Sequence, residues 1–166
     1  YALSTGQGLL ALKACDFAAE GKSPCEIAET LEAMRSRVNT SFVPDALDYL
    51  HKGGRCSLAA LMGAKILKLH PFIDMKDGRL YAKKKYMGGI ERCLKAYVDE
   101  LAQQYKNYDK ARCFITHSSC GPETVAKVRS LVEQLFGFDE IYETVAGNVV
   151  TSHCGKGTLG VLFIYE

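Results

Sequence analysis

The sequence predicts an α/β protein in which a mixed or antiparallel sheet packs in two layers with helices, preceded by the terminal helices of an incomplete α/β domain. Apolar residues recur at helical spacing through the first 34 residues, and from about residue 56 strand-like segments and helical segments alternate, with hairpins among the strands. We therefore expect residues 1–55 to be the remnant of a first domain with its connection, and residues 56–166 to form a second domain.

Two helices open the chain. Residues 8–20 carry apolar side chains at helical spacing, and Gly21 supplies a stop signal. Ser23 can then cap a second helix, because Pro24 suits the first helical position and Glu26 completes a capping box.

The middle of the chain combines short elements. A strand is expected over residues 40–43, followed by a brief helix that Asp45 caps and the glycines at 53–54 end. Ser57 is expected to cap a further helix, which Pro71 ends.

A hairpin is the clearest local prediction, since Asp77 and Gly78 separate two strand-like runs and Asp-Gly favours a tight turn. Helical spacing continues over residues 90–105, and Gly121, Pro122 and Glu123 begin another helix. The remaining strands are expected at residues 112–116, 141–145, 148–152 and 158–165.

Composition excludes several classes of protein. With 21 basic and 19 acidic residues the net charge is +2, which is not the strongly basic balance of a nucleic-acid binder. No apolar run reaches the roughly 18 to 20 residues of a membrane span, and no export signal is evident. Seven cysteines without a CxxC pair are typical of free thiols, so we expect a cytoplasmic protein.

Two constellations suit an anion. The segment 52–57 places two glycines and Arg55 before a helix start, where backbone N–H groups and a guanidinium can grip a carboxylate or phosphate. A plain turn between helices explains it equally well. The segment 151–158 sets His153 among hydroxyls, including Ser152 and Thr158, where an imidazole can hold an anionic head group or serve a structural role.

Other chemistry is less well supported. The segment 116–122 is also polar, but helix capping accounts for it. The four histidines lack metal-ligand spacing, so neither a metal nor another cofactor is expected. A cysteine nucleophile is a weaker hypothesis, because His153 and Cys154 would point to opposite faces of an extended chain.

Four motifs, in the same order along the chain, resemble the DegV family. They are the segments 3–8, 42–55, 70–78 and 153–160. The resemblance implies two α/β domains that hold a long-chain fatty acid in a tunnel between them. It also implies that the lipid is presented to a separate, dihydroxyacetone-kinase-like fatty-acid kinase, which makes an acyl phosphate.

The resemblance also assigns roles to residues. Arg55 matches an arginine of head-group and phosphotransfer chemistry, and His153 matches a histidine near the carboxylate. The expected tunnel wall comprises Leu58, Leu61, Met62, Phe72 and Ile73. Three departures stand out. Lys156 replaces a usual proline, the segment 85–87 replaces an arginine, and the family's carboxylate-binding hydroxyls would lie upstream of Tyr1.

We therefore expect a truncated, bacterial fatty-acid carrier without catalytic residues of its own. Two alternatives stay open. One is a self-contained enzyme that uses His153 with Cys120 or Cys154, and the other is a scaffold whose first helices pair in a homodimer.

Overall fold

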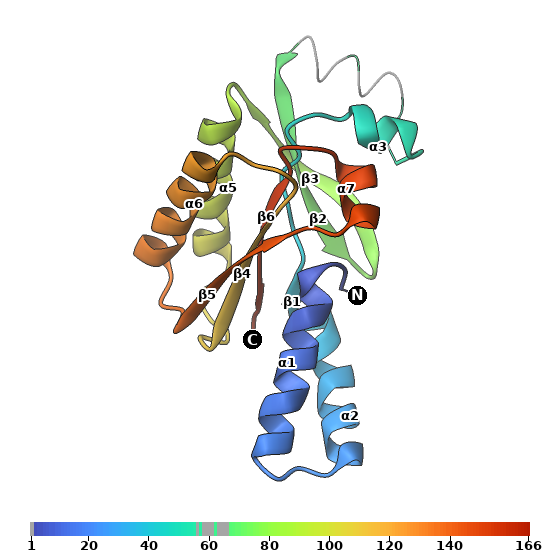
Figure 1. Ribbon diagram of the computed structural model, residues 1–166, viewed down its shortest axis with the longest axis vertical. Helices are drawn as coiled ribbons and strands as arrows, with labels where there is room; N and C mark the ends of the chain where they lie inside the picture. The colour runs from blue at the N-terminus through green and yellow to red at the C-terminus, as the bar shows by residue number, and fades with distance from the viewer. Residues whose placement is uncertain (1, 56, 58–61, 63–66) are drawn as a thin grey trace.

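A four-stranded mixed sheet forms the centre of the computed structural model, which describes residues 2–55, 57, 62 and 67–166 (Figure 1). The strand order is β1 (Val38–Asn39), β6 (Leu159–Ile164), β4 (Arg112–His117) and β5 (Glu140–Val145). β4 and β5 run parallel, whereas β6 is antiparallel to both β4 and β1. The α/β class is thus confirmed, and the sheet is mixed.

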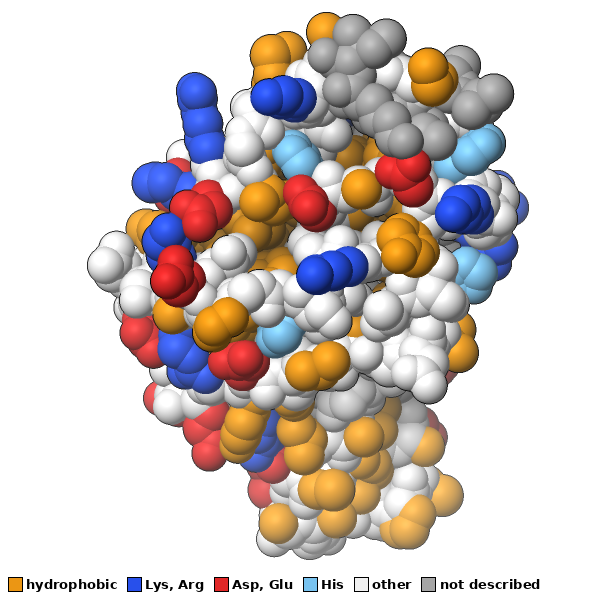
Figure 2. Space-filling model, turned by 45° about the horizontal axis from the view of Figure 1, so that its top comes forward, with side chains coloured by type: hydrophobic (Ala, Val, Ile, Leu, Met, Phe, Trp, Pro, Cys, Tyr) orange, Lys and Arg blue, Asp and Glu red, His pale blue; other side chains and the backbone are white. Residues whose placement is uncertain are grey.

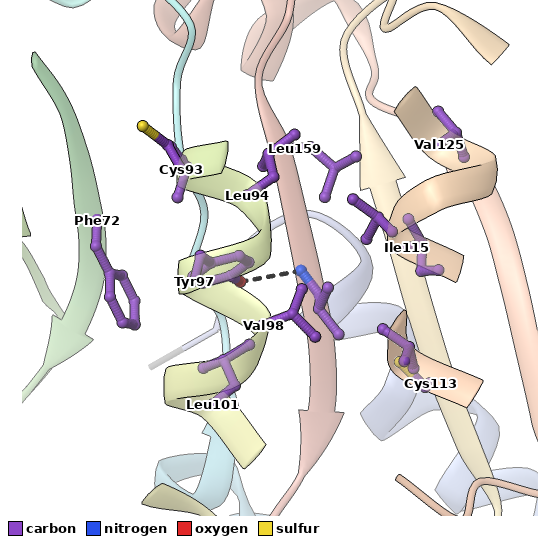
Figure 3. Packing of buried hydrophobic residues seen from close by; sticks show 14 of the residues in the cluster. Phe72, Cys93, Leu94, Tyr97, Val98, Leu101, Cys113, Ile115, Val125 and Leu159 are labelled. Atoms are coloured by element: carbon purple, nitrogen blue, oxygen red, sulfur yellow. Dashed lines mark hydrogen bonds between the residues drawn. The ribbon is translucent and has the colours of Figure 1, made fainter. Parts of the chain in front are cut away.

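The strand β6 is buried along its whole length because side chains from both of its faces enter hydrophobic clusters. Leu159, Val161 and Phe163 pack in the larger cluster with α5 (Ile90–Gln104) and α6 (Pro122–Leu135). Figure 3 shows how Tyr97, Val98 and Leu101 of α5 and Val125 of α6 fill this cluster. Leu162 and Ile164 face the opposite way, toward α1.

Helices α1 (Thr5–Ala19) and α2 (Pro24–Met34) extend side by side away from the sheet (Figure 1). α1 contacts β1, β4 and β6, and its Asp16 pairs with Arg112 of β4, whereas no residue of α2 is buried. The predicted capping box of α2 is confirmed, since Ser23 accepts from the Glu26 amide and Glu26 accepts from Ser23. Apolar side chains are visible on the surface of this helical pair in Figure 2.

The predicted hairpin is confirmed as β2 (Leu69–Lys76) and β3 (Arg79–Met87), with Asp77 and Gly78 both at positive φ. This hairpin forms a separate two-stranded sheet. It is joined to α5 by polar contacts, in which Lys84 and Tyr86 both bind Glu100.

The side chain of Tyr97 stands between two opposing backbone segments. By register Ser41 lies opposite Val161, since Asn39 pairs with Phe163 and Val43 bridges Leu159. In place of a direct backbone bond, the Tyr97 hydroxyl accepts from Val161 N–H at 3.0 Å and donates to the Ser41 carbonyl at 2.9 Å. The expected strand over residues 40–43 is therefore interrupted, and the regular part is β1, two residues earlier.

One predicted strand is wrong, because residues 148–152 lie in the helix α7 (Asn148–Cys154). Their β-branched side chains favour a strand, but tertiary context overrides that preference. Gly147 precedes the helix in an extended conformation, and the Thr151 hydroxyl donates to the Ala146 carbonyl across its first turn. Gly155, with φ of 83°, ends it.

Smaller corrections concern element ends. Asp45 does not cap α3 (Asp48–Lys52), whose N-cap is Leu47, and Pro71 lies inside β2. A short 3₁₀ turn (Arg35–Arg37) links α2 to β1. The helix predicted after Ser57 falls mainly outside the described residues. The division at residue 55 stays a prediction; β1, from the first part, pairs with β6 of the second.

Candidate functional site

Two sequence motifs separated by about a hundred residues meet at the contact between α3 and α7 (Figure 1). The contact is close because glycines line it. A Cβ added to Gly53 would lie 2.7 Å from Nδ1 of His153, and one added to Gly157 would lie 2.7 Å from the Asp45 side chain. Between them, a Cβ on Gly155 would overlap the ring of Tyr49.

His153 occupies the last turn of α7, where its half-buried ring rests on Gly53. Its Nδ1 atom is buried and has no hydrogen-bond partner within the described part of the chain. The ring therefore contacts the protein with its Nδ1 edge.

Arg55 contacts the same glycine. Its guanidinium is exposed and donates through Nη1 to the Gly53 carbonyl. Gly54, with φ of 73°, makes the turn that brings the arginine back over Gly53. A cation and an imidazole thus both lie next to one glycine, an arrangement suited to a carboxylate or a phosphate.

The two hydroxyl residues predicted beside His153 have local partners. Ser152 is exposed and donates to the Val149 carbonyl, whereas Thr158 is buried and donates to the Cys154 carbonyl at 2.8 Å. Thr158 thereby ties the loop after α7 to that helix. Ligand binding by either residue stays a prediction.

The residues predicted for the tunnel wall differ in exposure, and two of them are not described. Leu58 and Leu61 lie outside the described residues. Met62 is 52% exposed, whereas Phe72 is fully buried and meets Tyr97 edge to face. Ile73 is half-buried and pairs with Phe42 through backbone bonds. The structure does not bring the Phe72 side chain to an open surface.

A hydroxyl network that sequence reasoning missed joins α1 to the sheet. Thr116 of β4 bonds to Thr5 at 2.5 Å and to Thr144 of β5 at 2.8 Å. It borders a cavity of about 30 Å³, far below the volume of about 300 Å³ or more typical of a ligand pocket. The polar segment 116–122 was the available signal, but nothing in it pointed to Thr5 or Thr144.

His117, in that polar segment, is fully engaged. Its Nδ1 accepts from the Cys120 amide at 3.2 Å, and its Nε2 lies 3.3 Å from Glu143. A neutral ring with the proton on Nε2 satisfies both contacts. These local hydrogen bonds therefore give His117 a structural role.

The cysteines near histidines are poor nucleophiles. Burial raises the pKa of Cys154 to about 11, and burial, aided by Asp45, raises the pKa of Cys120 to about 11. Because the thiolate is the reactive form, both groups are mostly protonated thiols near neutral pH. Among the residues that the structure describes, no group of three or more His, Cys, Asp or Glu could hold a metal ion.

A mixed sheet with helices on both faces and a cation–histidine pair at an interhelical contact defines an α/β domain suited to binding an anionic small molecule. Solved structures share this fold. A DegV-family protein of Ruminococcus gnavus with vaccenic acid superposes with a TM-score of 0.79 at 25% identity, covering 93% of this chain and 55% of that one. DegV of Bacillus subtilis, a fatty-acid-binding protein, gives 0.72 at 27% identity, covering 97% and 57%.

This chain belongs to the DegV family. The family model described as "Uncharacterised protein, DegV family" matches residues 1–166. A DegV domain-containing protein of Clostridium perfringens is 33% identical over 162 residues, covering 96% of this chain and 54% of that protein. The chain thus spans about half the length of the curated relatives it matches. No helix among the described residues is long and apolar enough to cross a membrane.

Proposed function

We propose that this chain forms part of a fatty-acid carrier, in which Arg55 and His153 bind the carboxylate of a long-chain acid. The relatives from Ruminococcus gnavus and Bacillus subtilis support a fatty acid as the ligand class. The observation that carries the proposal is the meeting of the two motifs at Gly53, which sets a guanidinium and an imidazole around one point. A carboxylate accepts hydrogen bonds from both groups.

The acyl chain, on this proposal, runs from the head group past Met62 and Ile73. The exposed Met62 and the half-buried Ile73 offer apolar surface, and we keep Leu58 and Leu61 in the proposed wall. Phe72 would support the wall from the core side. Ser152 and Thr158 are kept as secondary contacts at the head group.

We further propose that the bound acid is presented to a fatty-acid kinase, which phosphorylates the carboxylate, and that the carrier supplies no catalytic residue. The fatty acid kinase B3 protein of Streptococcus pneumoniae, loaded with linoleic acid, has the same fold at 20% identity and a TM-score of 0.80. The raised pKa values of Cys154 and Cys120 also argue against a cysteine enzyme. ATP-dependent chemistry and the free thiols of the described residues suit the cytoplasm.

Native mass spectrometry with lipid extraction tests the binding step. This chain and its natural full-length form are purified from bacteria and compared with Arg55→Ala and His153→Ala. Each variant should retain at most about a tenth of the fatty acid, because losing a hydrogen bond to a charged group costs about 1.5–3 kcal/mol. Arg92→Ala, which removes an exposed arginine from α5, is the charge-matched control and should retain all of it.

The outcomes separate the candidate functions. A full-length protein that stays empty in excess fatty acid would refute the carrier proposal. Concentration-dependent association without lipid would favour the scaffold instead. Thiol-dependent turnover without a kinase would favour the enzyme.

The kinase step has its own test. Purified protein, oleate, ATP and a bacterial fatty-acid kinase should yield acyl phosphate only when all four are present. Arg55→Ala loaded with the same amount of lipid should slow its formation, because the arginine then no longer orients the carboxylate toward the kinase. Equal rates would refute a phosphotransfer role for Arg55.

A further inference from the structure

The His153 ring lies against a residue that has no side chain. A Cβ on Gly53 would lie 2.7 Å from Nδ1 and 3.5 Å from Cε1 of His153. Atoms at 2.7 Å overlap, so any other residue at position 53 would displace the ring. The imidazole is thus held against the backbone of the residue that precedes Gly54 and Arg55.

Backbone conformation does not explain the glycine. Gly53 has φ of −77° and ψ of 0°, which any residue can adopt. Gly54 is the opposite case, since its φ is 73° while an added Cβ would meet nothing within 4 Å. Gly53 is therefore required for space and Gly54 for conformation.

The surroundings of Nδ1 determine where a neutral ring carries its proton. Nδ1 is buried and faces the Gly53 backbone, with no partner among the residues described. A proton there would be a buried donor without an acceptor, which is rarer in proteins than an unpaired acceptor. The proton is accordingly favoured on Nε2, which makes the ligand-facing nitrogen a donor.

We infer that Gly53 is a positioning residue, which seats His153 so that Nε2–H is directed to the acyl carboxylate. This inference rests on the proposed function of the site. Close packing continues beside it, where Tyr49 lies against Gly155 and Asp45 lies against Gly157. The Arg55 guanidinium is fixed to the Gly53 carbonyl, so one residue aligns both ligand-binding groups.

Nitrogen NMR on ¹⁵N-histidine-labelled protein tests the tautomer directly, with His153→Gln used to assign the signal. In alkaline buffer, where an imidazole carries one proton, the ligand-free protein should hold the proton of His153 on Nε2. In Gly53→Ala the tautomer population should change, and fatty-acid affinity should fall about tenfold or more. Gly54→Ala, the matched control, should lose stability but keep the wild-type tautomer.

A double-mutant cycle keeps the test valid if Gly53→Ala is unstable. The destabilisation caused by Gly53→Ala should become smaller in a His153→Ala background, because the overlapping ring is then absent and the Tyr49 carbonyl, at 3.2 Å from the added Cβ, is the tight contact that remains. Equal destabilisation in both backgrounds, or a proton on Nδ1 in the wild type, would overturn the positioning role. These readouts need no ligand, so they stand apart from failure of the carrier proposal. If the wild type bound fatty acid and Gly53→Ala bound it equally well, the positioning role of Gly53 would be overturned while the carrier proposal stood.

Discussion

The substitution Tyr97→Phe tests how the sheet is completed where β1 stops. It removes one hydroxyl and leaves the ring in place. That hydroxyl accepts from Val161 N–H at 3.0 Å and donates to the Ser41 carbonyl at 2.9 Å, as the dashed line from Tyr97 in Figure 3 partly shows. Tyr97 is fully buried, and burial raises its pKa above the usual range, so the hydroxyl keeps its proton.

The expected loss is set by the groups left behind. A buried donor without a partner costs about 1–3 kcal/mol, and the Ser41 carbonyl loses a partner as well. We expect the free energy of unfolding to fall by about 2 kcal/mol. Urea denaturation should show a lower midpoint with an unchanged slope, since the surface exposed on unfolding is the same.

Tyr142→Phe is the matched control, because its hydroxyl donates only to the exposed Glu140 two residues away. That change should stay within about 0.5 kcal/mol of the wild type. If Tyr97→Phe behaved like this control, the hydroxyl would not be joining the two backbone segments, and the reasoning would be wrong.

Three further outcomes are expected. Gly155→Ala should destabilise the protein by at least about 2 kcal/mol in thermal melts, because both φ of 83° and the adjacent Tyr49 ring oppose a side chain. Gly147→Ala, where an added Cβ meets open space, should cost less than half as much. Hydrogen bonds from Arg112 lower the pKa of Asp16, so this pair stabilises the fold above about pH 4, and the contribution is lost as the pH falls further. In Asp16→Asn the free energy of unfolding should therefore depend less on pH in this acid range. A pH dependence equal to that of the wild type would contradict the assignment. Cys154 should react with a thiol reagent only on unfolding, in contrast to the exposed cysteines of α1 and α2, and rapid labelling of the native protein would disprove its burial.

The elements predicted best are those whose determinants lie within a few residues. The Asp77–Gly78 turn and the capping box of Ser23 and Glu26 each depend on local geometry alone, and both formed as expected. The failure at residues 148–152 has the opposite origin. Their β-branched composition is a local signal for a strand, whereas the helix depends on the Thr151 bond to Ala146 and on packing against α3.

The sequence singled out the residues of the proposed site but not their arrangement. Motif resemblance singled out Arg55 and His153, yet their proximity depends on space left open at Gly53. An absent side chain creates no hydrophobic or charge pattern, so one sequence cannot reveal which glycine serves a contact. The same applies to Thr5 and Thr144, whose common partner Thr116 only the folded chain identifies.

The central place of β6 has a consequence for how the chain folds. β6 is the last strand, yet it lies between β1 and β4, and the contact of Asn39 with Val161 joins residues 122 positions apart. Such distant pairings slow folding, because the long loop must close before its contacts contribute. During synthesis, the edges of β1 and β4 that will pair with β6 stay unpaired until β6 leaves the ribosome. In that interval the nascent chain presents strand edges that a neighbouring polypeptide could join.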